Sequence, residues 1–87
     1  MSVQSEYSRS LESMLDRLRG LTHAESAQWI ARLEASRVDT HPDLSSAARA
    51  CLDVLAAIDR DTPARAASGL HEPQERLEAH CRVILGE

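Results

Sequence analysis

Two cysteines and one histidine are the side chains of this sequence that could do metal or redox chemistry. Cys51 stands about thirty positions before the adjacent pair His80 and Cys81. A specific zinc site would need the close C-x₂-C or H-x₃-H spacing that the chain lacks. Adjacent residues also diverge by about 100° around a helix, so His80 and Cys81 would face different ways. The favoured interpretation is two apolar core thiols, with a thiol or metal sensor as an alternative, and pairing of the cysteines is left open.

The remaining histidines do not form a catalytic pattern. His23, His41 and His71 stand at or beside expected helix starts. No Ser-His-Asp, Cys-His or paired-carboxylate arrangement accompanies them. The chain has 87 residues and no Gly-rich loop or cofactor fingerprint, and so short a chain rarely forms a pocket of substrate size. We therefore expect no enzymatic activity, no cofactor and no small-molecule substrate.

Charge argues against nucleic acid as a partner. The formal net charge is −4, and Arg9, Arg17 and Arg19 share the first expected helix with three carboxylates. A nucleic-acid footprint needs clustered positive charge. All ten basic side chains are arginine and the sequence has no Phe. Because Arg and Ala have G/C-rich codons, this composition favours a bacterial or phage source.

Apolar residues recur at helical spacing in four segments, at about residues 6–19, 22–36, 40–60 and 73–85. Thr22 and Thr40 are expected to begin the second and third segments, and Gly20 to end the first in a left-handed conformation. The third segment has the widest apolar arc, roughly 160°, which predicts neighbours on two sides.

These segments predict an all-α fold. We expect a small up-and-down helix bundle of three long helices plus one short helical turn at residues 63–68, because short connections make successive helices antiparallel. Residues 1–87 are enough for one domain and no more.

The candidate interface consists of apolar residues off the main stripes. Trp29 lies at the edge of the second helix, where it either covers the rim of the core or anchors a protein interface, in which Trp is enriched. Tyr7 is the only other aromatic residue. Leu21 and Val38 in the connections, and Val83 on the flank of the last helix, would extend the same patch.

These features predict a non-enzymatic protein-protein interaction module, such as a regulator, adaptor or inhibitor. We expect it to bind another protein or a second copy of itself as a homodimer, through a helix face. One alternative is a DNA-associated helix-turn-helix regulator, because a short turn joins the second and third helices. The other is the sensor built on Cys51, Cys81 and His80. The chain has no signal-peptide pattern and no apolar run of roughly 20 residues, so we expect a cytoplasmic protein without membrane contact.

Overall fold

Four α-helices make up the fold. The computed structural model describes residues 3–21, 24–61 and 69–87. Over these residues the chain forms α1 (Val3–Arg19), α2 (Ala24–Glu34), a 3₁₀ turn η1 (Val38–Thr40), α3 (Leu44–Asp61) and α4 (His71–Leu85), and no strand. The all-α bundle prediction is confirmed: each of the four segments with helical spacing contains an α-helix, which is one long helix more than the three expected. The turn expected at 63–68 and the cap expected at Thr22 lie outside the described residues.

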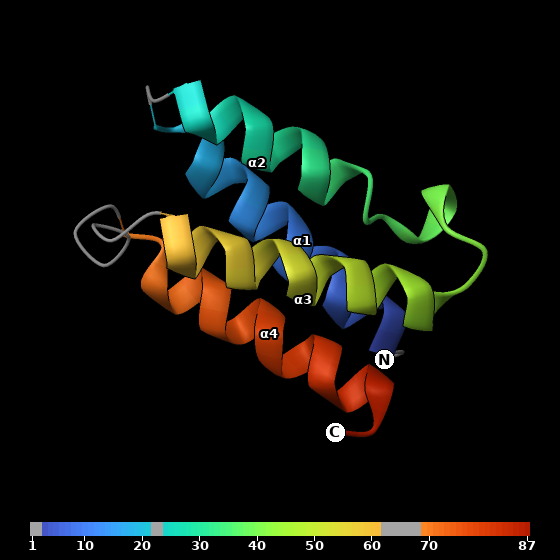
Figure 1. Cartoon of the computed structure of the whole chain (residues 1–87). Coiled ribbons are helices and arrows are strands. Elements are labelled where there is room, and N and C mark those ends of the chain that lie inside the picture. The colour runs from blue at the N-terminus through green and yellow to red at the C-terminus, as the bar shows by residue number, and fades with distance from the viewer. Residues whose placement is uncertain (1–2, 22–23, 62–68) are drawn as a thin grey trace.

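The helices form an up-and-down bundle in which each one packs against two others (Figure 1). Helix α1 packs between α2 and α4, and α3 contacts the same two helices from the opposite side. Successive helices run in opposite directions. The prediction that α3 has neighbours on two sides is therefore confirmed. No helix of the described chain combines the length and the apolar character that crossing a bilayer requires.

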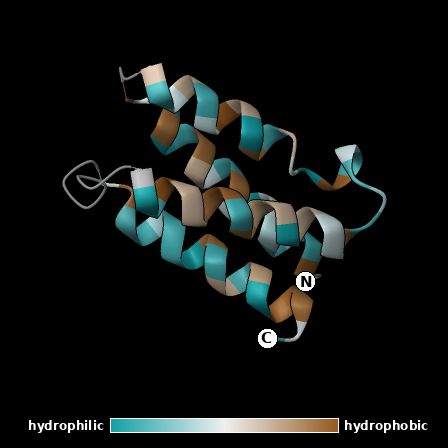
Figure 2. Ribbon diagram, viewed as in Figure 1, coloured by the Kyte–Doolittle hydropathy of each residue, from teal (hydrophilic) through white to brown (hydrophobic). Residues whose placement is uncertain are grey.

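Amphipathic faces build a mainly aliphatic core. Each helix carries alternating hydrophobic and hydrophilic positions (Figure 2), and the hydrophobic ones meet in the centre of the bundle. The fully buried large side chains include Leu11 and Leu15 of α1, Leu33 of α2, Ile58 of α3 and Leu77 of α4. Burying a side chain of this kind stabilises the fold by roughly 1.5–3 kcal/mol. The packing therefore depends on all four helices at once.

Asp43, and not Thr40, begins α3. The Ser46 backbone N–H donates to Asp43 Oδ1 at 2.7 Å, which is the usual N-cap bond. Thr40 belongs to η1, where its hydroxyl donates to the Arg37 carbonyl at 2.9 Å. The difference follows from Pro42, because a residue before proline avoids the helical conformation and His41 is accordingly extended.

The left-handed glycines are Gly69 and Gly86, with φ angles of 78° and 75°. Gly86 ends α4, and its N–H donates to the Val83 carbonyl at 3.2 Å. The expectation of a left-handed Gly20 was wrong. Helix α1 instead ends by tightening its last turn, with the Leu21 N–H donating to the Leu18 carbonyl at 3.0 Å, and this geometry needs no positive φ.

One buried tyrosine joins the first half of the chain together. The hydroxyl of Tyr7, in α1, donates to the Ser36 carbonyl at 2.7 Å, with the Ala47 carbonyl of α3 at 3.3 Å. Burial raises the pKa of Tyr7 well above its usual range, so the phenol keeps the proton that it donates. The bond positions α1 against the α2–α3 connection, residues 35–43.

We expect Tyr7→Phe to lower the free energy of unfolding by about 1–2 kcal/mol, because the ring stays while a buried carbonyl loses its donor. Urea unfolding followed by circular dichroism measures the change. Ser8→Ala, at an exposed position beside Tyr7, is the control and should unfold like the parent. Equal midpoints for Tyr7→Phe and Ser8→Ala would contradict a structural role for the hydroxyl.

The cap of α3 should make stability depend on pH. The bond from the Ser46 N–H holds the pKa of Asp43 below its ordinary value of 3.8. A carboxyl whose pKa is lowered by folding stabilises the fold above its unfolded pKa, and this contribution is lost as pH falls through the folded pKa. Asp43→Ala should therefore lower Tm at neutral pH, by a deficit that shrinks below pH 3.8.

Thermal unfolding of Asp43→Ala and of the parent over a series of pH values measures this deficit. Asp39→Ala removes an exposed carboxylate of η1 and serves as the control. A deficit of the same size at every pH would show that the charge of Asp43 does not contribute.

Candidate functional site

A groove runs along the contact between α1 and α4. Its main cavity has a volume of about 400 Å³ and is lined by Glu6, Arg9, Ser10, Ser13, Arg76 and His80. A smaller hollow of about 40 Å³ continues it, lined by Ser13, Arg17, Glu72, Pro73 and Arg76. Because Ser13 and Arg76 line both, we treat the two as one feature, the α1–α4 groove.

Short polar side chains open this groove. Ser10 follows Tyr7 by three positions, so it lies near the apolar face of α1 where a large side chain would fill the space against α4. His80 occupies the corresponding position of α4, three residues after the buried Leu77. The two helices meet there through a polar pair, and the cavity lies beside it.

Ser10 and His80 form the polar contact between the helices. Ser10 Oγ lies 2.6 Å from His80 Nδ1, and the serine is only 4% exposed. In the described chain no carboxylate orients the other ring nitrogen of His80. Ser10 also lies inside a helix, where the backbone N–H groups are used in helical bonds and form no oxyanion hole. The pair therefore satisfies a buried hydroxyl and lacks the other parts of an acyl-transfer site.

Two arginines beside the groove have no partner among the described residues. Arg9 and Arg17 make no ion pair, hydrogen bond or ring contact in the structure of the described chain. Arg76, the third arginine of the groove, is bonded to Glu72 at 3.1 Å. The lining thus holds three arginines against two glutamates on a chain whose net charge is −4. The groove is locally positive.

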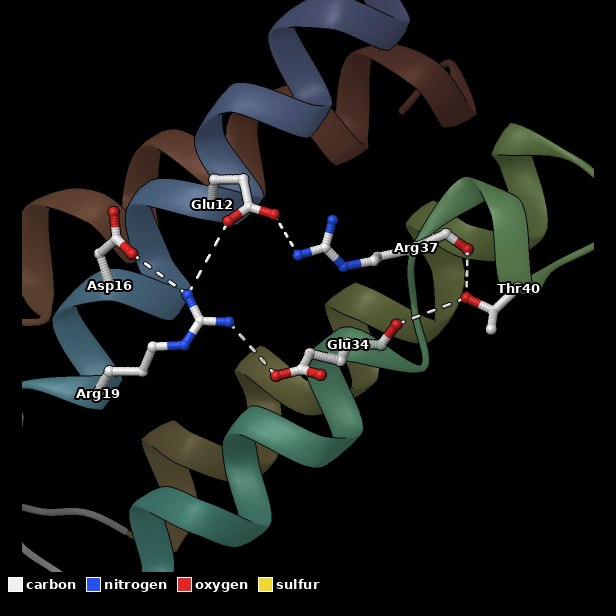
Figure 3. Close-up of polar contacts among 6 residues, drawn as sticks. All are labelled: Glu12, Asp16, Arg19, Glu34, Arg37 and Thr40. Atoms are coloured by element: carbon white, nitrogen blue, oxygen red, sulfur yellow. Dashed lines mark hydrogen bonds and ion pairs between the residues drawn. The ribbon is translucent and has the colours of Figure 1, made fainter.

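The opposite edge of α1 is neutralised by an ion-pair network (Figure 3). Arg19 lies 3.2 Å from Asp16, 3.4 Å from Glu34 of α2 and 4.0 Å from Glu12. Glu12 also pairs with Arg37 of the α2–α3 connection. These side chains are partly to largely exposed, and surface pairs of this kind contribute only about 0–1 kcal/mol each. The charged side chains on that edge of α1 are therefore paired with one another within the fold.

The residues predicted to form an interface differ in exposure, and two of them, Tyr7 and Val38, line one hollow between α1 and the α2–α3 connection. Tyr7 is fully buried and Trp29 is only 4% exposed. Leu21 and Val38 are partly buried against the core, and Val83 is 65% exposed. The interface role of these five residues stays a prediction, and Val83 is the one whose side chain is largely accessible.

Trp29 covers the edge of the core. The guanidinium carbon of Arg32 lies 5.3 Å from the centre of its ring, within the range of a cation–π contact. Its Nε1 is buried without a hydrogen-bond partner among the residues described. Of the two interpretations of Trp29, the burial favours the rim of the core over an exposed anchor.

The two cysteines are neighbours in the core. Cys51 and Cys81 are both buried and unbridged. The side-chain hydrogen bond with Cys81, together with burial, raises the pKa of Cys51. His80 is bonded to Ser10, and within the described ranges no cluster of three or more His, Cys, Asp or Glu side chains could hold a metal ion. Cys51, Cys81 and His80 therefore do not form a three-ligand metal cluster, and the thiol-sensor alternative stays a prediction.

Ser10, Ser13 and Arg76 are groove residues that the sequence interpretation missed. The available signal was a serine at helical spacing from Tyr7, which breaks the apolar face of α1. That signal predicts a polar core position, but the partner on α4 depends on how the two helices are aligned. Comparisons with protein-family models, curated proteins and solved structures found no match, so the groove is interpreted from its own geometry.

The thiols should be unreactive in the folded protein. Thiolate is the reactive species, and a raised pKa and complete burial both suppress it at Cys51. We expect a thiol reagent such as DTNB to label the native protein at least about a hundredfold more slowly than the protein in guanidinium chloride. The absorbance of the released thionitrobenzoate measures the rate. Rapid labelling of either native cysteine would contradict the inert-core interpretation.

Proposed function

We propose that this chain is a non-enzymatic protein-interaction module, a regulator, adaptor or inhibitor, that binds another protein through the face formed by α1 and α4. The observation that carries the proposal is the charge of Arg9 and Arg17 beside the α1–α4 groove, which no described residue pairs. Exposed apolar side chains at one end of the same face support it. Interfaces commonly combine arginine with an apolar contact in this way.

The apolar part of this face lies at the start of α1 and the end of α4. Val3 and Val83 are the exposed large hydrophobic side chains of the described residues, at 40% and 65%. Val83 follows His80 by one helical turn, and α1 begins where the antiparallel α4 ends (Figure 1). The last turn of α4 is correspondingly hydrophobic (Figure 2). In the proposed complex, this end of the face supplies the apolar contact with the partner protein, and the α1–α4 groove supplies the polar contact.

The geometry gives less support to the helix-turn-helix alternative. The turn of that motif has about 3–4 residues, whereas α2 and α3 are separated by residues 35–43, which include η1. Helix α3 also begins beside the carboxylate of Asp43, which would face DNA phosphates with a negative charge.

Self-association remains a second form of the same proposal. In a two-fold dimer the same patch meets itself, so the locally positive groove of one copy would face that of the other, and like charges repel. We therefore propose a different protein as the main partner, and the homodimer stays a prediction.

The unbridged cysteines are typical of a reducing compartment, which supports the proposed cytoplasmic location.

A photo-cross-linking amino acid placed at Val83 tests the proposal. We expect it to give a discrete adduct with another protein in the native cell, because the residue lies beside the proposed contact. The same amino acid at Ala56, an exposed position of α3, is the matched control and should give none. Mass spectrometry identifies the adduct, and a dimer of the purified chain would reveal self-association. Identical products from both positions, or none from Val83, would count against the α1–α4 face.

A further inference from the structure

We infer that the α1–α4 groove binds a carboxylate of an acidic segment in the partner protein. This inference rests on the proposed function and names the chemistry that the partner must offer. It starts from a difference between the two edges of α1. Arg19 has carboxylate partners on the α2 side, whereas Arg9 and Arg17 have none on the α4 side.

The sign of the ligand follows from the charges of the lining. Arg9, Arg17 and Arg76 outnumber Glu6 and Glu72. With both glutamates counted the lining keeps a net charge of +1, and neither Arg9 nor Arg17 makes an ion pair among the described residues. An anionic group in the groove would gain from this field, and a cationic one would be repelled.

The shape of the lining favours a carboxylate. A guanidinium group presents parallel N–H donors that match the two oxygens of a carboxylate. Ser13 lies between the two parts of the groove, and its hydroxyl has no bond to another described side chain. Ser10 and His80 are bonded to each other and form one wall. A cavity of about 400 Å³ has room for a Glu or Asp side chain.

The surrounding charge excludes a long polyanion. Glu6 and Glu72 border the groove, and the whole chain carries a net charge of −4. A nucleic-acid backbone would bring many phosphates near these carboxylates and release few counterions in return. A short segment that places one or two carboxylates between the arginines avoids this repulsion.

Binding of a labelled acidic peptide tests the inference. The probe is a fluorescein-labelled octapeptide of alternating Glu and Ala, with the matched Gln–Ala peptide as its control, and fluorescence anisotropy is the readout. We expect the Glu peptide to bind more tightly than the Gln peptide. Arg9→Gln combined with Arg17→Gln should weaken it about fivefold, and salt should weaken it as well.

The matched control variant combines Arg49→Gln with Arg60→Gln. It removes the same charge from α3, which lies across the bundle from α1, and should change the affinity less than about twofold. Equal losses in both double variants would overturn the inference, because net charge alone would then explain binding. Tighter binding of a fluorescein-labelled DNA duplex, displaced by no acidic peptide, would also overturn it.

The two proposals fail in different ways. If the cross-link from Val83 forms but the Glu peptide does not bind, the acidic ligand is wrong and the α1–α4 interface stands. If the peptide binds through Arg9 and Arg17 but no cross-link forms from Val83 in the cell, the carboxylate site stands and the protein-binding role is wrong. Circular dichroism of each variant confirms that these exposed substitutions leave the helices intact.

Discussion

The buried hydroxyl of Tyr7 is the constraint on which the arrangement of helices depends. A phenol inside an aliphatic core must donate its proton, since an unpaired buried hydroxyl is costly. Its acceptor is the Ser36 carbonyl at 2.7 Å, which comes just after α2, and the Ala47 carbonyl of α3 lies 3.3 Å away. Cys51 of α3 and Cys81 of α4 belong to the same buried core. The hydroxyl of Tyr7 thus joins α1 to the α2–α3 connection and to α3, and it fixes how α1 is rotated.

That rotation determines what each edge of α1 presents. Successive residues turn by about 100° around the axis of a helix. Measured around the axis of α1 from the inward direction of Tyr7, Ser10 and Arg17 lie on the same side, near −60° and −80°. Arg19 falls on the other side, near +120°. The first side meets α4 and lines the groove, and the second meets α2 and joins the ion-pair network. The groove is therefore a consequence of seating a tyrosine in the core.

The sequence pattern was enough for the helices because spacing of apolar residues is a local property. The pattern was not enough for the ends of the helices, where two local preferences compete. Thr40 has the sequence of an N-cap, but Pro42 keeps His41 extended. The start of α3 is therefore at Asp43. Gly20 was likewise expected to end α1 in the left-handed conformation, but the last turn of α1 tightens instead and needs no positive φ. The contact of Ser10 with His80 joins residues seventy positions apart, so it depends on helix alignment, which local spacing does not encode.

Stability does not account for the arginines of the groove. An exposed guanidinium is well hydrated, and pairing it at the surface gains about 0–1 kcal/mol, so the fold neither needs Arg9 and Arg17 nor suffers much from them. The α2 side shows that this chain does pair such charges where neighbouring carboxylates are in reach. On the α4 side Glu72 is bonded to Arg76, and Glu6, which lines the same cavity as Arg9, forms no ion pair with it. Charge that the fold leaves unpaired beside a cavity is best matched by an acidic group from outside the chain.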